Sequence, residues 1–140
     1  MTAFERSRTV TDRFARRVFL VAGIWGLLIM MPQYFLEGRI GRDAPPPIMH
    51  PEYFYGFIGV TIAWQLVFLV IARDPIRYRP LMPVAVVEKA AFGPAMVVLY
   101  MLGRVNLEML GAGILDMIIG IFFIAAFLRT PKDPPSRLGR

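Results

Sequence analysis

Three charged residues lie well inside otherwise apolar stretches of this chain, away from their ends: Glu88 and Lys89 in one stretch, and Asp116 in the next. An ionised side chain at the middle of a bilayer costs roughly 2.5–3.5 kcal/mol on insertion scales, so it is expected to find a partner inside the protein. At about 1.5 Å of helical rise per residue, Lys89 and Asp116 fall at similar depths, and the lysine stem spans the difference. The sequence therefore predicts an internal ion pair between Lys89 and Asp116.

Glu88 is expected to need a different partner. Adjacent residues lie roughly 100° apart around a helix, so Glu88 and Lys89 are not expected to face one another. Gln65, in a third apolar stretch, lies at a similar depth, and Thr61 is one turn away on the same face. We therefore predict a polar cluster made of Thr61, Gln65, Glu88, Lys89 and Asp116.

The residue types leave three interpretations of this cluster open. It is a structural ion pair that fixes helix register, a proton-linked or ligand-binding site, or the acid and base of an enzyme. No nucleophile, metal-ligating set or phosphate-binding loop accompanies the charges, and the chain has no cysteine. We therefore expect no catalytic residues, no metal and no cofactor.

Four apolar stretches must position these residues. They cover residues 18–36, 54–72, 81–102 and 106–128, and about 20 helical residues suffice to cross the bilayer core. The hydrophobic fraction of 56% exceeds the ~45–50% apolar share that is usual for soluble domains. We expect an all-α fold, a left-handed transmembrane antiparallel four-helix bundle with up-down-up-down topology. Small residues beside the charges, including Gly93, Gly113 and Gly120, predict that the last two helices pack closely.

The positive charges predict how the chain is threaded. Five basic residues precede the first stretch, three lie between the second and third, and four follow the last, whereas the other two connections hold only three. The positive-inside rule then predicts a multi-pass protein of a bacterial inner membrane with both termini in the cytoplasm. The net charge of +6 is explained without a nucleic-acid partner. We divide the chain into a basic cytoplasmic segment (1–17), a four-helix transmembrane domain (18–128) and a disordered cytoplasmic tail (129–140).

Several short motifs resemble those of small, uncharacterised four-span bacterial membrane proteins whose layout is loosely similar to the DoxX-like group. They run from His50-Pro51-Glu52-Tyr53 to Trp64-Gln65, and continue through Arg73-Asp74-Pro75, Arg79-Pro80 and Glu88-Lys89 followed by Phe92. The similarity covers roughly residues 34–128. It implies a compact antiparallel four-helix bundle and no particular activity.

These observations favour a non-enzymatic membrane protein that binds a small apolar or lipid-like ligand at the polar cluster. One alternative is a structural or accessory subunit, whose partner is another membrane protein or a second copy of this chain. A second alternative is a membrane enzyme that acts on a lipid or quinone. The three differ in whether the charges are closed off or reached from a pocket between the helices.

Overall fold

The computed structural model describes residues 3–43 and 47–132. Its elements are α1 (Ala3–Met30), a 3₁₀ turn (Met31–Phe35), α2 (Glu37–Asp43), α3 (Pro51–Arg73), a second 3₁₀ turn (Arg79–Leu81), α4 (Met82–Met101) and α5 (Leu107–Arg129). Every regular element among the described residues is helical, which confirms the all-α fold class.

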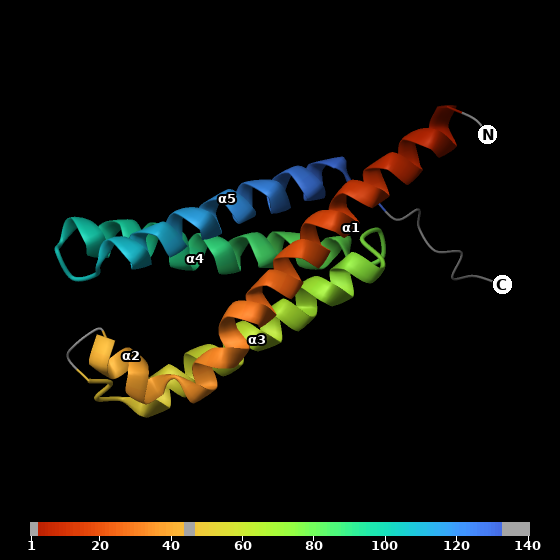
Figure 1. The fold of residues 1–140 in the computed structure, drawn as a ribbon. Coiled ribbons are helices and arrows are strands. Elements are labelled where there is room, and N and C mark those ends of the chain that lie inside the picture. The colour runs from red at the N-terminus through yellow and green to blue at the C-terminus, as the bar shows by residue number, and fades with distance from the viewer. Residues whose placement is uncertain (1–2, 44–46, 133–140) are drawn as a thin grey trace.

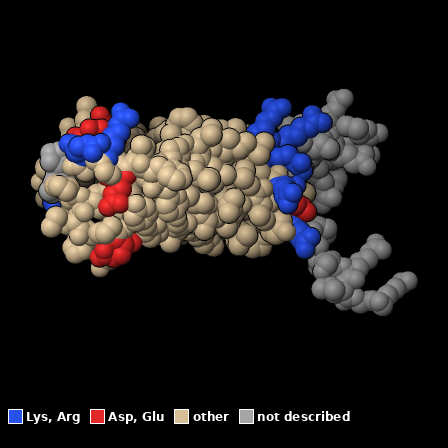
Figure 2. All heavy atoms as spheres, turned by 60° about the horizontal axis from the view of Figure 1, so that its bottom comes forward, with Lys and Arg blue, Asp and Glu red and all other residues tan. Residues whose placement is uncertain are grey.

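Four of these helices are long and apolar enough to cross a membrane. The candidate spans are Arg13–Phe35, Pro51–Arg73, Arg79–Met101 and Leu107–Arg129. In Figure 2 an uncharged belt of side chains separates one end of the molecule, where Lys and Arg predominate, from the other end, where both signs of charge are present. The protein is therefore a polytopic membrane protein that contacts the lipid bilayer.

The four long helices form two antiparallel pairs, α1 with α3 and α4 with α5. Figure 1 shows that the pairs meet at the end that holds the α3–α4 connection and diverge toward the end that holds α2 and the α4–α5 turn. We call these the basic end, marked by Arg73, Arg77 and Arg129, and the loop end. The contact between the pairs comes mainly from α1 and α5, while α3 and α4 touch little.

The apolar core fills the half of the molecule nearer the basic end. Phe19, Phe68 and Phe123, from α1, α3 and α5, are fully buried there. The rings of Phe19 and Phe123 stack with centroids 4.2 Å apart, and the edge of Phe68 packs on Phe123 at 4.9 Å. This aromatic triad joins the two helix pairs, because each pair contributes at least one ring.

The α4–α5 hairpin is held close by two glycines that face each other. A Cβ on Gly93 would lie 2.9 Å from the backbone oxygen of Gly113, and a Cβ on Gly113 would lie 2.6 Å from the Cβ of Met96. The turn itself begins at Gly103, whose φ of +68° is a left-handed conformation that glycine adopts without strain. The amides of Gly103 and Arg104 bond to the carbonyls of Tyr100 and Leu99, which closes a Schellman cap.

The structure differs from the sequence expectations in two places. The bundle that the resemblance implies to be compact is open at the loop end, because the core joins the pairs only near the basic end. The connection after α1 contains the unexpected helix α2. The first helix begins at Ala3, ahead of the candidate span Arg13–Phe35, and the division of the chain at residue 17 stays a prediction. In the expected tail, α5 ends at Arg129, and residues 133–140 lie outside the described part of the chain.

Candidate functional site

Lys89 on α4 pairs with Asp116 on α5, as the sequence predicts. The Nζ atom of Lys89 donates a hydrogen bond of 3.0 Å to Oδ1 of Asp116, and only 7% of the lysine side chain is exposed. Close approach of the helices makes this contact reachable, because Gly120 lies beside the base of the lysine, where an added Cβ would be 3.3 Å from Lys89 Cβ. The same ammonium lies 5.4 Å from the centroid of the Phe68 ring, at the edge of the core.

The expectation that Glu88 and Lys89 do not meet is wrong. Lys89 Nζ lies 3.2 Å from Oε2 and 3.5 Å from Oε1 of Glu88. The flexible lysine stem spans the angle between adjacent residues and brings its ammonium between the two carboxylates. Oε2 of Glu88 is buried and receives no hydrogen bond from the described residues, because the short contact lacks hydrogen-bond geometry. Lys89 therefore bridges both acids through ion pairs.

The predicted contact between Gln65 and Glu88 is also absent. Gln65 is 2% exposed, and its amide nitrogen donates 3.2 Å to the backbone oxygen of Thr61, in its own helix. Its carboxamide packs against α1 where Gly26 leaves room, since a Cβ on Gly26 would overlap the Gln65 oxygen. Gln65 and Thr61 therefore belong to the site as parts of its wall and not as ligands of Glu88.

A cleft of about 270 Å³ between the two helix pairs brings all five predicted residues together. Thr61 and Gln65 line it from α3, Glu88 and Lys89 from α4, and Asp116 from α5. It lies where the pairs begin to diverge, above the aromatic triad. The side chains of Glu88 and Asp116 remain 17% and 19% exposed there. The charges are therefore not closed off inside the bundle.

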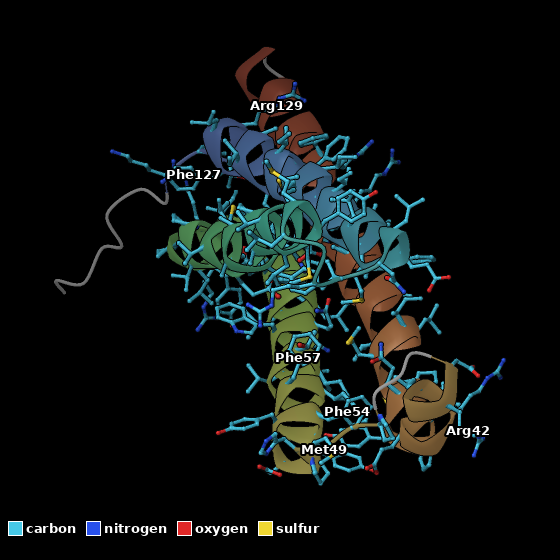
Figure 3. The ribbon with its side chains drawn as sticks, turned by 90° about the vertical axis from the view of Figure 1, so that its left-hand side faces the viewer. Arg42, Met49, Phe54, Phe57, Phe127 and Arg129 are labelled. Atoms are coloured by element: carbon cyan, nitrogen blue, oxygen red, sulfur yellow. The ribbon has the colours of Figure 1, made fainter. Side chains whose placement is uncertain are left out.

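Aromatic rings that the sequence analysis did not assign to the site complete its walls. Phe57 on α3 and Phe92 on α4 approach each other with centroids 6.3 Å apart, and Trp25 lines the cleft from α1. Figure 3, seen from the loop end, shows the position of Phe57 on α3. The sequence spacing could have predicted that Phe57 and Phe92 line the site. Phe57 precedes Thr61, and Phe92 follows Glu88, by one helical turn, which places each ring on the same helix face as a predicted site residue.

The charges in the cleft do not balance. One ammonium faces two carboxylates, so the cluster carries a net charge of −1 when all three groups are ionised. Lys89 engages Oδ1 of Asp116, and no hydrogen bond from the described residues reaches its Oδ2. The cleft therefore offers hydrogen-bond acceptors at its polar floor and apolar or aromatic side chains along its walls.

Comparisons with known proteins add no assignment. No protein-family model, curated protein or solved structure matches this chain.

Proposed function

We propose that this protein binds a small apolar or lipid-like ligand in the cleft between its helix pairs, with a polar group of the ligand at Glu88, Lys89 and Asp116. The observation that carries the proposal is the combination of an open cavity with two carboxylates that share one ammonium at its floor. Small-molecule sites commonly pair mostly apolar walls with a few polar groups that fix orientation. A ligand that donates a hydrogen bond fits this floor.

The glycines bear on the alternative of an accessory subunit. A subunit that docks through small residues would expose a flat glycine face, and the candidates are Gly23 and Gly26 on α1 and Gly56 and Gly59 on α3. Gly23 and Gly26 instead accommodate side chains of α3, so that part of α1 is already used within the chain. The hydroxyl of Tyr34 lies at Gly59, while Gly56 meets open space, so the alternative keeps a candidate face on α3.

The proposal includes the orientation in the membrane. We place the protein in a bacterial inner membrane with the basic end in the cytoplasm and the loop end outside. The support is the distribution of positive charge, with Arg73, Arg77 and Arg129 at one end. In this orientation the cleft opens toward the outer half of the bilayer.

Native mass spectrometry of the detergent-extracted protein tests the ligand proposal. Ala112 lines the cleft on α5, and the neighbouring Gly111 has no atom within 4 Å of an added Cβ. Ala112→Phe fills the cleft, while Gly111→Phe places the same ring on the outer surface as a matched control. We expect the wild type and Gly111→Phe to retain a co-purifying lipid or quinone-sized molecule, and Ala112→Phe to lose it.

Two results would contradict the proposal. One is a wild-type protein that retains no small molecule, and the other is an Ala112→Phe variant that retains it as well as the wild type does. Far-ultraviolet circular dichroism of each variant shows whether the helices are intact. If Ala112→Phe loses helicity, the smaller Ala112→Leu repeats the comparison against Gly111→Leu.

A further inference from the structure

A second hollow lies on the outside of the molecule, between α1 and α5. It measures about 570 Å³ and is lined by apolar side chains and, at its basic end, by Arg17. The apolar residues are Phe14, Val18, Val21, Ala22 and Trp25 from α1, and Leu115, Ile118, Ile119 and Phe122 from α5. We call it the lateral groove. Because it lies on the uncharged belt of the molecule, it faces the acyl chains of the bilayer.

The lateral groove and the polar cleft have three lining residues in common. Trp25, Leu115 and Ile119 line both of them. The charged cluster is therefore separated from the lipid-facing groove by side chains and not by a helix backbone. Trp25 is 49% exposed and Leu115 is 42% exposed, so neither is held in place by a packed core. This side of the cleft contrasts with the α3–α4 side, where Phe57 and Phe92 approach each other.

The charge of the cleft selects the kind of polar group that fits there. With all three groups ionised, a net charge of −1 remains in a site of low polarity, where an uncompensated charge is costly. A monocation removes that imbalance, and an ammonium also donates the hydrogen bonds that Glu88 and Asp116 can accept. Trp25, Phe57 and Phe92 line the same cleft, and aromatic rings attract a cation through cation–π contacts. An anionic head is disfavoured in the cleft, and Arg17 gives it a partner only at the far end of the lateral groove.

We propose that the ligand is a single-chain amphiphile with a protonated amine head, which binds at Glu88 and Asp116 while its alkyl chain passes Trp25 and lies in the lateral groove. This inference rests on the proposed function, since it names the ligand class for the same cleft. It also gives a route of entry, because an amphiphile dissolved in the bilayer reaches the cleft from the side. The groove holds the tail of the same molecule whose head occupies the cleft.

Photolabelling in phosphatidylcholine nanodiscs tests the inference. The probe is a long-chain primary alkylammonium with a diazirine at its chain end, and the label is mapped by peptide mass spectrometry. We expect label on groove residues such as Val18, Val21 and Ile118, and loss of most of that label when a short-chain alkylammonium competes for the cleft. A matched long-chain carboxylate probe places its head at Arg17, so its label is expected near Trp25 and is not displaced by the short amine.

A pair of α5 variants separates the groove from the cleft. Ile118 lines only the lateral groove, and Ile121 is 65% exposed and lines neither hollow. Ile118→Phe should reduce competable labelling by the long-chain amine at least several-fold, while Ile121→Phe should label as the wild type does. Short-amine binding is followed by the fluorescence of Trp25 in a Trp64→Phe background and should be unchanged in both variants.

The outcomes distinguish the two proposals. Competable label confined to cleft residues such as Met109 or Phe57 would overturn the position of the chain and leave the cleft as a ligand site. Equal competable labelling by the amine and the carboxylate would overturn the ammonium head. Label that no short amine displaces would overturn the inference, and the native mass spectrometry then decides whether the cleft binds a different ligand.

Discussion

Lys89 donates a 3.0 Å hydrogen bond to Asp116 across the α4–α5 hairpin. The same ammonium lies 3.2 Å from Glu88, so one buried cation serves two acids. The three groups therefore differ in the number of their ionic partners. Lys89 has two, whereas each carboxylate has only Lys89 among the described residues.

This inequality predicts an order of stability among neutral substitutions. Lys89→Met leaves two carboxylates together without a cation and should lower the free energy of unfolding by about 3 kcal/mol or more. Asp116→Asn leaves Lys89 paired with Glu88 and should cost about 1–2 kcal/mol. Unfolding in mixed detergent micelles, followed by circular dichroism, measures both. Exchange of the two residues, Lys89→Asp with Asp116→Lys, should recover part of the loss; equal losses in both single variants would contradict this ordering.

The close contact of α4 and α5 predicts different effects for two neighbouring glycines. Gly113→Ala places a methyl group against Met96 and the Gly93 backbone and should destabilise the protein by about 1–3 kcal/mol. Gly111→Ala meets open space and should be neutral or slightly stabilising, since alanine favours a helix more than glycine does. The same unfolding measurement applies. A Gly113→Ala variant as stable as Gly111→Ala would show that the helices do not pack through this face.

The aromatic triad predicts which phenylalanines hold the helix pairs together. Phe19→Ala removes a fully buried ring that stacks on Phe123 and should lower the free energy of unfolding by about 3 kcal/mol. Phe35, which is 88% exposed near the loop end, provides the control, and Phe35→Ala should have little effect. Thermal unfolding of the two variants side by side measures the difference. Comparable midpoints would argue against a core at the basic end.

The proposed orientation predicts which ends of the molecule a water-soluble reagent reaches. The chain lacks cysteine, so Arg42→Cys at the loop end and Arg77→Cys at the basic end each introduce a single thiol. In intact bacterial cells whose outer membrane has been permeabilised, a membrane-impermeant maleimide should label the first variant. The second should react only after the inner membrane is also opened. The reverse pattern would place the termini outside.

The sequence predicts the four long helices and the Lys89–Asp116 pair for the same reason. A membrane requires apolar helices of a certain length, and charges within them must find partners, so composition and spacing carry the information. The turn at Gly103 follows equally from its short connection. The orientation and the ligand are not tested by the fold and stay predictions.

The divergence of the helix pairs could not be predicted in this way. It depends on how three phenylalanine rings stack at one end, and that contact has no marker in the pattern of apolar residues. The error at Glu88 has a similar origin, because the spacing of residues around a helix describes the backbone and not the reach of a lysine side chain.

The aromatic triad lies near the basic end, and the two helix pairs diverge from there toward the loop end. Arg79 strengthens the basic end, since its side chain donates 2.8 Å to the carbonyl of Thr130 and lies over the ring of Phe127. The two helix pairs are therefore joined near the aromatic triad, which we call the joint, and their ends at the loop end, the tips, are separate. The part of α5 from Phe123 back to Leu107 is about 24 Å long, so a tilt of roughly 10° at the joint moves that tip by roughly 4 Å. A small difference in the angle at the joint therefore becomes a larger difference in the width of the cleft toward the loop end.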